Sequence, residues 1–310
     1  MLKHILVVST PDSIEDTLHQ TKPIAQHLKA KVTLLCLLTP TASPDGTHFI
    51  DPLEWHIHKV EVKTAIDEMV AELGQTGTDV YTELLESTDP AAIIDYAEKQ
   101  SVDLIVLARM TDNVNDLMNM MIKDSRVPIF TLHHDYQPDA REAECYQTIV
   151  VPLDGSQRAE SALPLATMIA QLCQGEIVLA HIVQKPEMPR RAPLSEHDLK
   201  LSEELVRTNH KQVKQYLEQT ADRLQCPVKV QIKVDDNVVT GLQNLIKEEQ
   251  ADLLILCAHG YSGIPQQPCG HITRSLIASS RIPVLTVPDL STDRGHAARH
   301  QNEAHHTKVR

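Results

Sequence analysis

The sequence predicts an α/β protein made of two tandem, doubly wound (Rossmann-like) parallel-sheet domains that form an intramolecular pseudo-dimer. Three observations predict it: the two halves of the 310-residue chain repeat each other, their apolar runs are short and continuous, and helical patterns lie between these runs. Continuous apolar runs are typical of strands covered by helices on both faces. Strand–helix alternation then implies parallel strand pairing through right-handed crossovers.

The repeat consists of matched segments that keep their order while the offset between them grows from 144 to 155 residues. A duplicated domain with small insertions explains this pattern, and chance similarity does not. The matched pairs are residues 4–8 with 148–152, 24–26 and 32–38 with 169–171 and 177–183, 102–107 with 251–256, and 126–132 with 281–287.

Each matched apolar run predicts a strand, and the segments between the runs predict helices. In the second half, apolar residues at helical spacing predict helices over residues 158–172 and 239–249. A further helix over residues 273–280 follows a glycine-containing loop. Residues 127–132 and 282–287 are the expected last strands of the two halves. Unpaired sheet edges are avoided in soluble proteins, so the two halves can pair with each other through these strands where the strands form sheet edges.

We expect domains at residues 1–135 and 146–290. A polar stretch with a proline and mixed charges predicts an exposed linker at residues 136–145. Residues 291–310 contain a single large aliphatic residue, Val309. This composition predicts a disordered tail.

Charge and composition exclude several classes of function. The chain has 29 basic and 42 acidic residues and a net charge of −13, which argues against binding to nucleic acid or to anionic membranes. Aromatic residues make up only 3%, too few for a base-stacking platform. No apolar run approaches the roughly 18 residues that span a bilayer, and no signal peptide is recognisable. We therefore expect a cytoplasmic protein.

The six cysteines include no CxxC pair. We expect reduced, mostly buried thiols, because that state is more common for such cysteines than disulfides or zinc ligation. The histidines of the tail have no Cys or carboxylate framework around them, so we predict no metal site.

Ligands of open parallel sheets bind beyond the carboxyl ends of the strands, and three strand ends in the second half carry candidate residues. Asp154 follows the first of these strands, and Ile182 lies at the end of the second. The third strand ends at Cys257 and leads through a loop with several glycines into a helix that begins near Thr273. Glycines let backbone amides approach an anion, and a helix N-terminus favours negative charge.

A structural interpretation stays open at each of these places. Asp154, Gly155 and Ser156 also suit an ordinary strand–helix turn. His181, in an apolar strand, is more often a hydrogen-bonded core residue than a ligand or a base. The glycine loop is also consistent with a flexible surface loop.

The combination of residues 149–156, 251–256 with the following glycine loop, and 281–287 resembles the universal stress protein (UspA-like) family in a tandem arrangement. The resemblance covers about residues 1–290. The ATP-binding branch of that family has the pattern Gly-x2-Gly-x9-Gly-Ser/Thr. With Pro283 in register, the four signature positions fall on Cys257, Gly260, Gly270 and His271. Both spacings match, whereas Cys257 and His271 depart from the pattern.

The resemblance implies a site for ATP or a related adenine nucleotide in the second half, with Mg²⁺ as its companion. Asp154 and Ile182, together with Pro152, would hold the adenine and ribose end of the nucleotide. The phosphates would lie against the loop and the start of the helix, near Cys257, at Gly260, Gly270, His271, Ile272 and Thr273.

The first half lacks these features. Thr10 stands at the position of Asp154, and the glycine loop is replaced by residues 109–116. Asp112 and Asp116 in that replacement would repel a triphosphate. We therefore expect a degenerate half that serves as a scaffold.

These observations favour a stress-response protein that binds adenine nucleotide as a sensor or regulatory module. P-loop, GxGxxG, GxSxG and HExxH motifs are absent from the sequence, so any ATP hydrolysis or autophosphorylation would be slow. Two alternatives stay open: a nucleotide-independent protein-interaction scaffold, and an anion or small-metabolite binder with His271 as a pH-dependent donor. The sequence leaves dimerisation of whole chains undecided.

Overall fold

The computed structural model describes residues 2–38, 51–73, 79–108, 114–132, 145–186, 195–261 and 269–289. The predicted tail and residues 136–144 of the predicted linker lie outside this part of the chain. Cys145, the last residue of that linker, is described and is buried.

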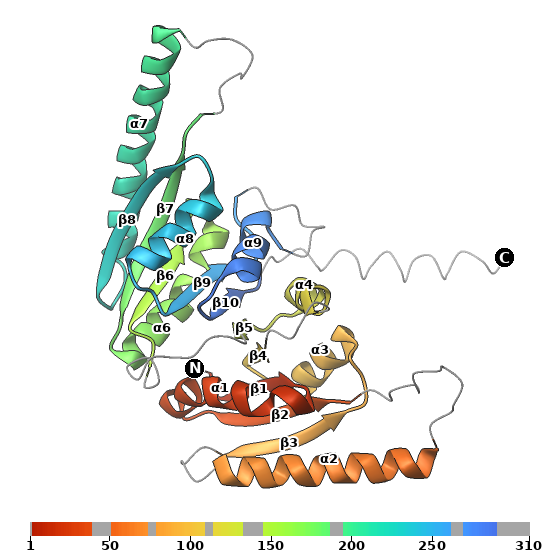
Figure 1. Cartoon of the computed structure of the whole chain (residues 1–310). Coiled ribbons are helices and arrows are strands. Elements are labelled where there is room, and N and C mark those ends of the chain that lie inside the picture. The colour runs from red at the N-terminus through yellow and green to blue at the C-terminus, as the bar shows by residue number, and fades with distance from the viewer. Residues whose placement is uncertain are drawn as a thin grey trace, which may run out of the picture.

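The first half alternates strands and helices as predicted (Figure 1). Asp89 starts one of its helices by accepting a hydrogen bond from the Ala91 backbone N–H, and Pro90 takes the first helical position, where its missing N–H is harmless. The elements of this half are β1 (His4–Ser9), η1 (Pro11–Ser13), α1 (Ile14–Leu28), β2 (Lys31–Leu37), α2 (Pro52–Leu73), β3 (Val80–Leu85), α3 (Pro90–Lys99), β4 (Leu104–Ala108), α4 (Val114–Asp124) and β5 (Ile129–Leu132).

The second half repeats this order. Its elements are β6 (Thr148–Pro152), α5 (Gln157–Glu160), α6 (Leu163–Cys173), β7 (Glu176–Gln184), α7 (Glu196–Ala221), β8 (Val228–Asp235), α8 (Val238–Glu248), β9 (Leu253–Cys257), α9 (His271–Ser279) and β10 (Val284–Val287).

The predicted single helix over residues 158–172 is wrong, because the chain forms the separate helices α5 and α6 there. Pro164 lies in the first turn of α6. Proline has no backbone N–H and is tolerated in the first turn of a helix but not in its interior. A new helix therefore begins at Leu163.

All ten strands of the described chain join in one sheet, in the order β3-β2-β1-β4-β5-β10-β9-β6-β7-β8. Pairing is parallel everywhere except between β5 and β10, which pair antiparallel with Phe130 opposite Leu285. The predicted pairing of the two last strands is thus confirmed. The two halves form the expected pseudo-dimer within one chain, and β3 and β8 are the outer strands of the sheet.

Both faces of the sheet are covered, and each buried cluster contains residues from both halves. At the joint, the rings of Phe130 and Tyr146 meet edge to face with their centroids 6.0 Å apart. Full burial of one large aliphatic side chain stabilises a fold by about 1.5–3 kcal/mol. The continuous apolar strands therefore account for both the sheet and its joint.

An aspartate repeated in both halves holds the start of the central strand of each half. Asp103 Oδ2 accepts hydrogen bonds from the backbone N–H groups of Lys3 (2.7 Å) and His4 (3.1 Å). Asp252 accepts them from Gln147 (2.6 Å) and Thr148 (3.1 Å). These carboxylates satisfy amides at the amino edge of the sheet, so their role belongs to the scaffold.

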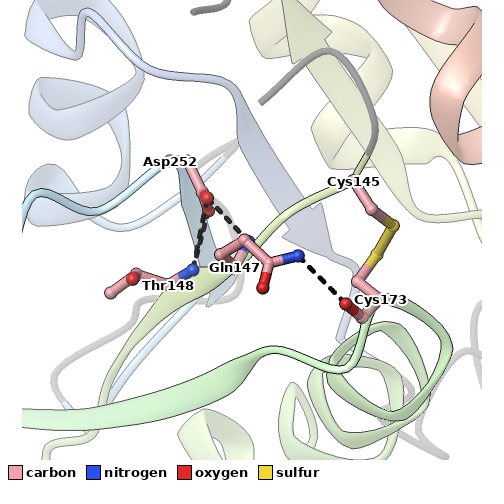
Figure 2. The surroundings of a disulfide bond; sticks show 5 residues. All are labelled: Cys145, Gln147, Thr148, Cys173 and Asp252. Atoms are coloured by element: carbon pink, nitrogen blue, oxygen red, sulfur yellow. Dashed lines mark hydrogen bonds between the residues drawn. A yellow bond between two sulfur atoms is a disulfide. The ribbon is translucent and has the colours of Figure 1, made fainter. Parts of the chain in front are cut away.

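A disulfide between Cys145 and Cys173 contradicts the expectation that all cysteines are reduced thiols. Figure 2 shows it beside Gln147, whose side-chain amide donates to the Cys173 backbone carbonyl at 3.0 Å. The Cα atoms lie 5.3 Å apart, within the usual range for a disulfide. The bond ties the residue just before β6 to the end of α6. The remaining cysteines, Cys36, Cys226, Cys257 and Cys269, are free thiols.

None of the described helices combines the length and the apolar character that crossing a bilayer requires.

Candidate functional site

A cavity of about 580 Å³ opens at the carboxyl ends of β6, β7 and β9. Carboxyl ends of parallel strands meet at one edge of a sheet, so the loops that follow them lie together. The cavity is lined by all nine residues that the sequence predicted for the site, which are Pro152, Asp154, Ile182, Cys257, Gly260, Gly270, His271, Ile272 and Thr273.

Asp154 is part of a tight turn as well as of the cavity. Its Oδ1 accepts hydrogen bonds from the backbone N–H (3.0 Å) and hydroxyl (2.6 Å) of Ser156. Its Oδ2 accepts from the backbone N–H of Tyr261 at 2.6 Å. Gly155 has a φ of +84°, a conformation that favours glycine. Asp154 thus joins the turn after β6 to the loop after β9, while its side chain stays exposed.

The two glycines of the loop are under different constraints. A Cβ atom on Gly260 would lie only 2.1 Å from Asp154 Oδ2. A Cβ atom on Gly270 would meet nothing closer than the Ala258 backbone oxygen at 3.5 Å, an ordinary contact. A side chain at residue 260 would therefore displace the Asp154 carboxylate from its present position, whereas residue 270 has room for a side chain.

The Cys257 thiol is hydrogen-bonded to two other side chains of the protein. The Ser161 hydroxyl donates to its sulfur at 3.4 Å, and the thiol donates to Asp289 Oδ1 at 3.1 Å. Burial raises the pKa of Cys257 to about 11, and the Asp289 carboxylate adds to this effect. The thiol is therefore neutral and unsuited to act as a nucleophile.

Asp289 also faces His259, a contact that the sequence did not predict. The second carboxylate oxygen of Asp289 lies 2.8 Å from Nδ1 of the buried His259. Asp289 comes two residues after β10, and His259 comes two residues after β9. Because nothing in their spacing along the chain indicates contact, only the parallel pairing of β9 with β10 brings them together.

The start of α9 forms another part of the cavity wall. The first backbone N–H groups of a helix have no acceptor within the helix and, with the helix dipole, favour an anion. Here these groups belong to His271, Ile272 and Thr273. The Thr273 hydroxyl donates to the Cys257 backbone carbonyl at 3.0 Å, so its proton is already used. His271 is exposed at the first helical position.

Ile182 presents its backbone to the cavity. The side chain lies beside α8, where a Cβ atom on Gly241 would be only 3.0 Å from Ile182 Cδ1. β6 pairs with β7 only as far as Ala180, whose carbonyl accepts from Leu153 N–H at 2.9 Å. Backbone groups alternate between the two neighbouring strands, so the N–H and C=O of Ile182 face the side where β6 has already ended.

His181 is hydrogen-bonded to the backbone, in line with the structural interpretation, and it also lines the cavity. Its Nδ1 lies 2.6 Å from the Leu153 carbonyl oxygen. Burial lowers the pKa of His181, although the Leu153 carbonyl and Asp154 oppose this shift. The neutral ring donates from Nδ1 because a carbonyl can only accept, so Nε2 is an acceptor.

One wall of the cavity was missed by the sequence analysis. Asn209, Gln212 and Val213 of α7 line it, as does Gln184 at the end of β7. The three α7 residues share a helix face at spacings of three and four. That spacing is a signal in the sequence, but it does not tell which way the face points.

The predicted absence of a ligand site from the first half can be compared with the structure only in part. Thr10, at the counterpart of Asp154, has its hydroxyl 3.2 Å from the Ser13 hydroxyl. Residues 109–113 of the replaced loop lie outside the described chain, so the loss of a site in this half stays a prediction.

The fold and the cavity define a duplicated, Rossmann-like α/β protein with a candidate ligand site at the carboxyl edge of its second half. A comparison with family models identifies the class more closely. The model of the universal stress protein family matches residues 1–114 and 146–288, and the chain belongs to this family.

Individual relatives agree with this assignment. The chain is 26% identical over 156 residues to universal stress protein MJ0577 of Methanocaldococcus jannaschii, a match that covers 46% of this chain and 94% of the relative. A universal stress protein structure from Archaeoglobus fulgidus aligns with a TM-score of 0.61 at 15% identity, covering 92% of this chain and 96% of that one. The structure of PA1789, a protein of unknown function from Pseudomonas aeruginosa, aligns with a TM-score of 0.63 at 15% identity, covering 93% and 92%. The two structures support the tandem fold.

Proposed function

We propose that the cavity of the second half binds an adenine nucleotide and that the protein is a nucleotide-sensing regulatory module of a stress response. The observation that carries this proposal is the meeting of all nine predicted residues around one cavity. A carboxylate lies in one part of its lining and a helix N-terminus in another. A nucleotide has hydroxyl groups and phosphates that suit these two features.

Different residues around the cavity bind the phosphates, the ribose and the base of the nucleotide. Phosphate oxygens accept hydrogen bonds from the first N–H groups of α9. Asp154 accepts from a ribose hydroxyl, since a carboxylate has about four acceptor positions and three are used by Ser156 and Tyr261. The backbone of Ile182 bonds to the flat base.

The chemistry of the cavity favours binding over turnover. No Lys or Arg is among the described residues that line it, and rapid phosphoryl transfer needs cations at the transferred group. The Cys257 thiol is neutral and hydrogen-bonded. Within the described residues, no cluster of His, Cys, Asp or Glu could hold a metal ion, so Mg²⁺ would arrive with the phosphates of a nucleotide.

Equilibrium dialysis with ATP and AMP tests this proposal. The wild-type protein should bind at least one of them at concentrations below millimolar, and Asp154→Asn should weaken binding. Asp95→Asn is the matched control, because Asp95 is an exposed carboxylate in an i,i+4 pair with Lys99 on α3. The absence of binding at millimolar nucleotide would refute the proposal.

The alternative of a nucleotide-independent scaffold rests on a specific observation. Both oxygens of Asp154 and the hydroxyl of Thr273 already have protein partners. A partner protein captured equally well with and without ATP would favour the scaffold. The third candidate, an anion binder that uses the exposed His271, requires an affinity for inorganic phosphate that falls with rising pH and that His271→Ala removes.

A further inference from the structure

The cavity has a polar wall that neither the family pattern nor the proposed function uses. Asn209 and Gln212 of α7 and His181 of β7 line the cavity together, and we call these three residues the α7 wall. Asn209 and Gln212 are three positions apart and so lie on one face of the helix. α7 packs against β7 and β8, as Figure 1 shows, and this packing directs the face with Val213 to the cavity.

The amides of this wall are available to a ligand. Across the residues that the structure describes, no hydrogen bond involves the side chain of Asn209 or Gln212. Asn209 is half-buried and Gln212 is exposed. A ligand in the cavity would therefore meet two amides that make no hydrogen bond to any other part of the chain that the structure describes.

The third member of the wall supplies a fixed acceptor. The bond from His181 Nδ1 to the Leu153 carbonyl leaves Nε2 of the neutral ring unprotonated. The wall thus offers two amide donors, two amide acceptors and one ring acceptor, and it carries no charge. This pattern suits the edge of an uncharged heteroaromatic ring and not a phosphate.

We propose that the α7 wall reads the edge of the purine base and selects adenine over guanine. This inference rests on the proposed function, which puts the phosphates at the start of α9 and the base at the backbone of Ile182, the residue next to His181 of the α7 wall. Side-chain amides pair with adenine through a matched donor and acceptor. His181 Nε2 accepts from the exocyclic amino group of adenine, whereas the O6 oxygen of guanine would face it as a second acceptor.

Calorimetric titration with AMP and GMP tests the wall. The wild-type protein should bind AMP more tightly than GMP. In His181→Ala/Asn209→Ala/Gln212→Ala, which removes all three side chains of the wall, AMP binding should weaken by about tenfold and the AMP-to-GMP preference should shrink towards one. Gln215→Ala is the matched control: it removes an exposed amide of α7 that does not line the cavity, and both affinities should stay unchanged. Thermal unfolding of each variant shows whether α7 remains folded.

The outcomes separate the two proposals. If the wild-type protein binds neither nucleotide, the proposed function fails, and this inference fails with it. If it binds AMP and the triple variant keeps the same preference, the α7 wall does not read the base, although the proposed function stands. An equal loss of affinity for AMP and GMP also overturns the inference, because it shows a packing effect without discrimination.

Discussion

Replacing Gly260 by alanine should disturb the candidate site through one atom of Asp154. The new Cβ would lie 2.1 Å from Asp154 Oδ2, where real Cβ contacts are essentially never under 3.0 Å. The carboxylate therefore has to move by about 0.9 Å. That displacement removes the 2.6 Å hydrogen bond from Tyr261 N–H to Oδ2.

The size of the effect follows from this one hydrogen bond. Hydrogen bonds to charged groups contribute about 1.5–3 kcal/mol to stability when they are buried. Asp154 is exposed, and solvent screening reduces the expected loss in free energy of unfolding to about 1 kcal/mol. If Asp154 also binds the ligand, its displacement should reduce the binding free energy by about 1.4 kcal/mol, which corresponds to a tenfold weaker nucleotide affinity.

A double-mutant cycle tests the mechanism. Gly260→Ala is measured by urea unfolding and by AMP titration, both in the wild-type protein and in Asp154→Ala, which has no Oδ2 to collide with. Gly260→Ala should lower the free energy of unfolding and the AMP affinity of the wild-type protein, and it should change both very little in the Asp154→Ala variant. Equal costs in both would refute the reasoning and point to backbone strain in the loop.

Three further predictions concern the disulfide, a histidine and a thiol. Reduction of Cys145–Cys173, with a sequence separation of 28, should lower the free energy of unfolding by about 3–4 kcal/mol; an unchanged urea midpoint in dithiothreitol would contradict this. Burial keeps the pKa of His181 below 6.5 in the folded protein, so the unfolded chain binds the proton first and stability should fall as the pH drops below 6.5. His181→Asn should flatten that part of the pH dependence of the urea midpoint, and identical profiles would count against the assignment. Cys257, with a pKa of about 11, should be alkylated by iodoacetamide at pH 8 more slowly than the half-buried Cys226; equal rates by mass spectrometry would show that the thiol is accessible.

The topology was predictable because it depends on patterns that occur twice in the chain. Each matched apolar run became a strand, and the pairing of β5 with β10 agrees with the cost of leaving two sheet edges open. The antiparallel direction of that pairing was not predicted. The meeting of some of the nine predicted residues at one cavity has a related reason, because Pro152, Ile182 and Cys257 lie in strands and the sheet positions them. Gly270, His271, Ile272 and Thr273 come more than ten residues after β9, and they were assigned from the spacing of the family pattern. A binding role for any of the nine residues stays a prediction.

Other features depend on contacts between segments far apart in the sequence. The disulfide joins two cysteines whose spacing matches no motif, and the contact of His259 with Asp289 requires β9 and β10 to lie side by side. Asn209 and Gln212 line the cavity only because α7 has a particular rotation on the sheet. Helical periodicity predicts a face but not its direction.

The aspartates show which positions serve the sheet in both halves and which belong only to the candidate site of the second half. Asp103 and Asp252 satisfy the same amides in both halves, so the requirements of the sheet were kept in each. Asp154 has Thr10 at its counterpart, and a hydroxyl cannot replace a carboxylate that accepts three hydrogen bonds. The two halves therefore differ in the candidate site while sharing the fold.

The cavity also lies close to the joint, because Asp289 contacts both Cys257 and His259 and follows β10 by two residues. On the proposed function, a ligand that shifts the loop after β9 would act on the strand that connects the halves, and this coupling is the physical argument for the proposed regulatory role.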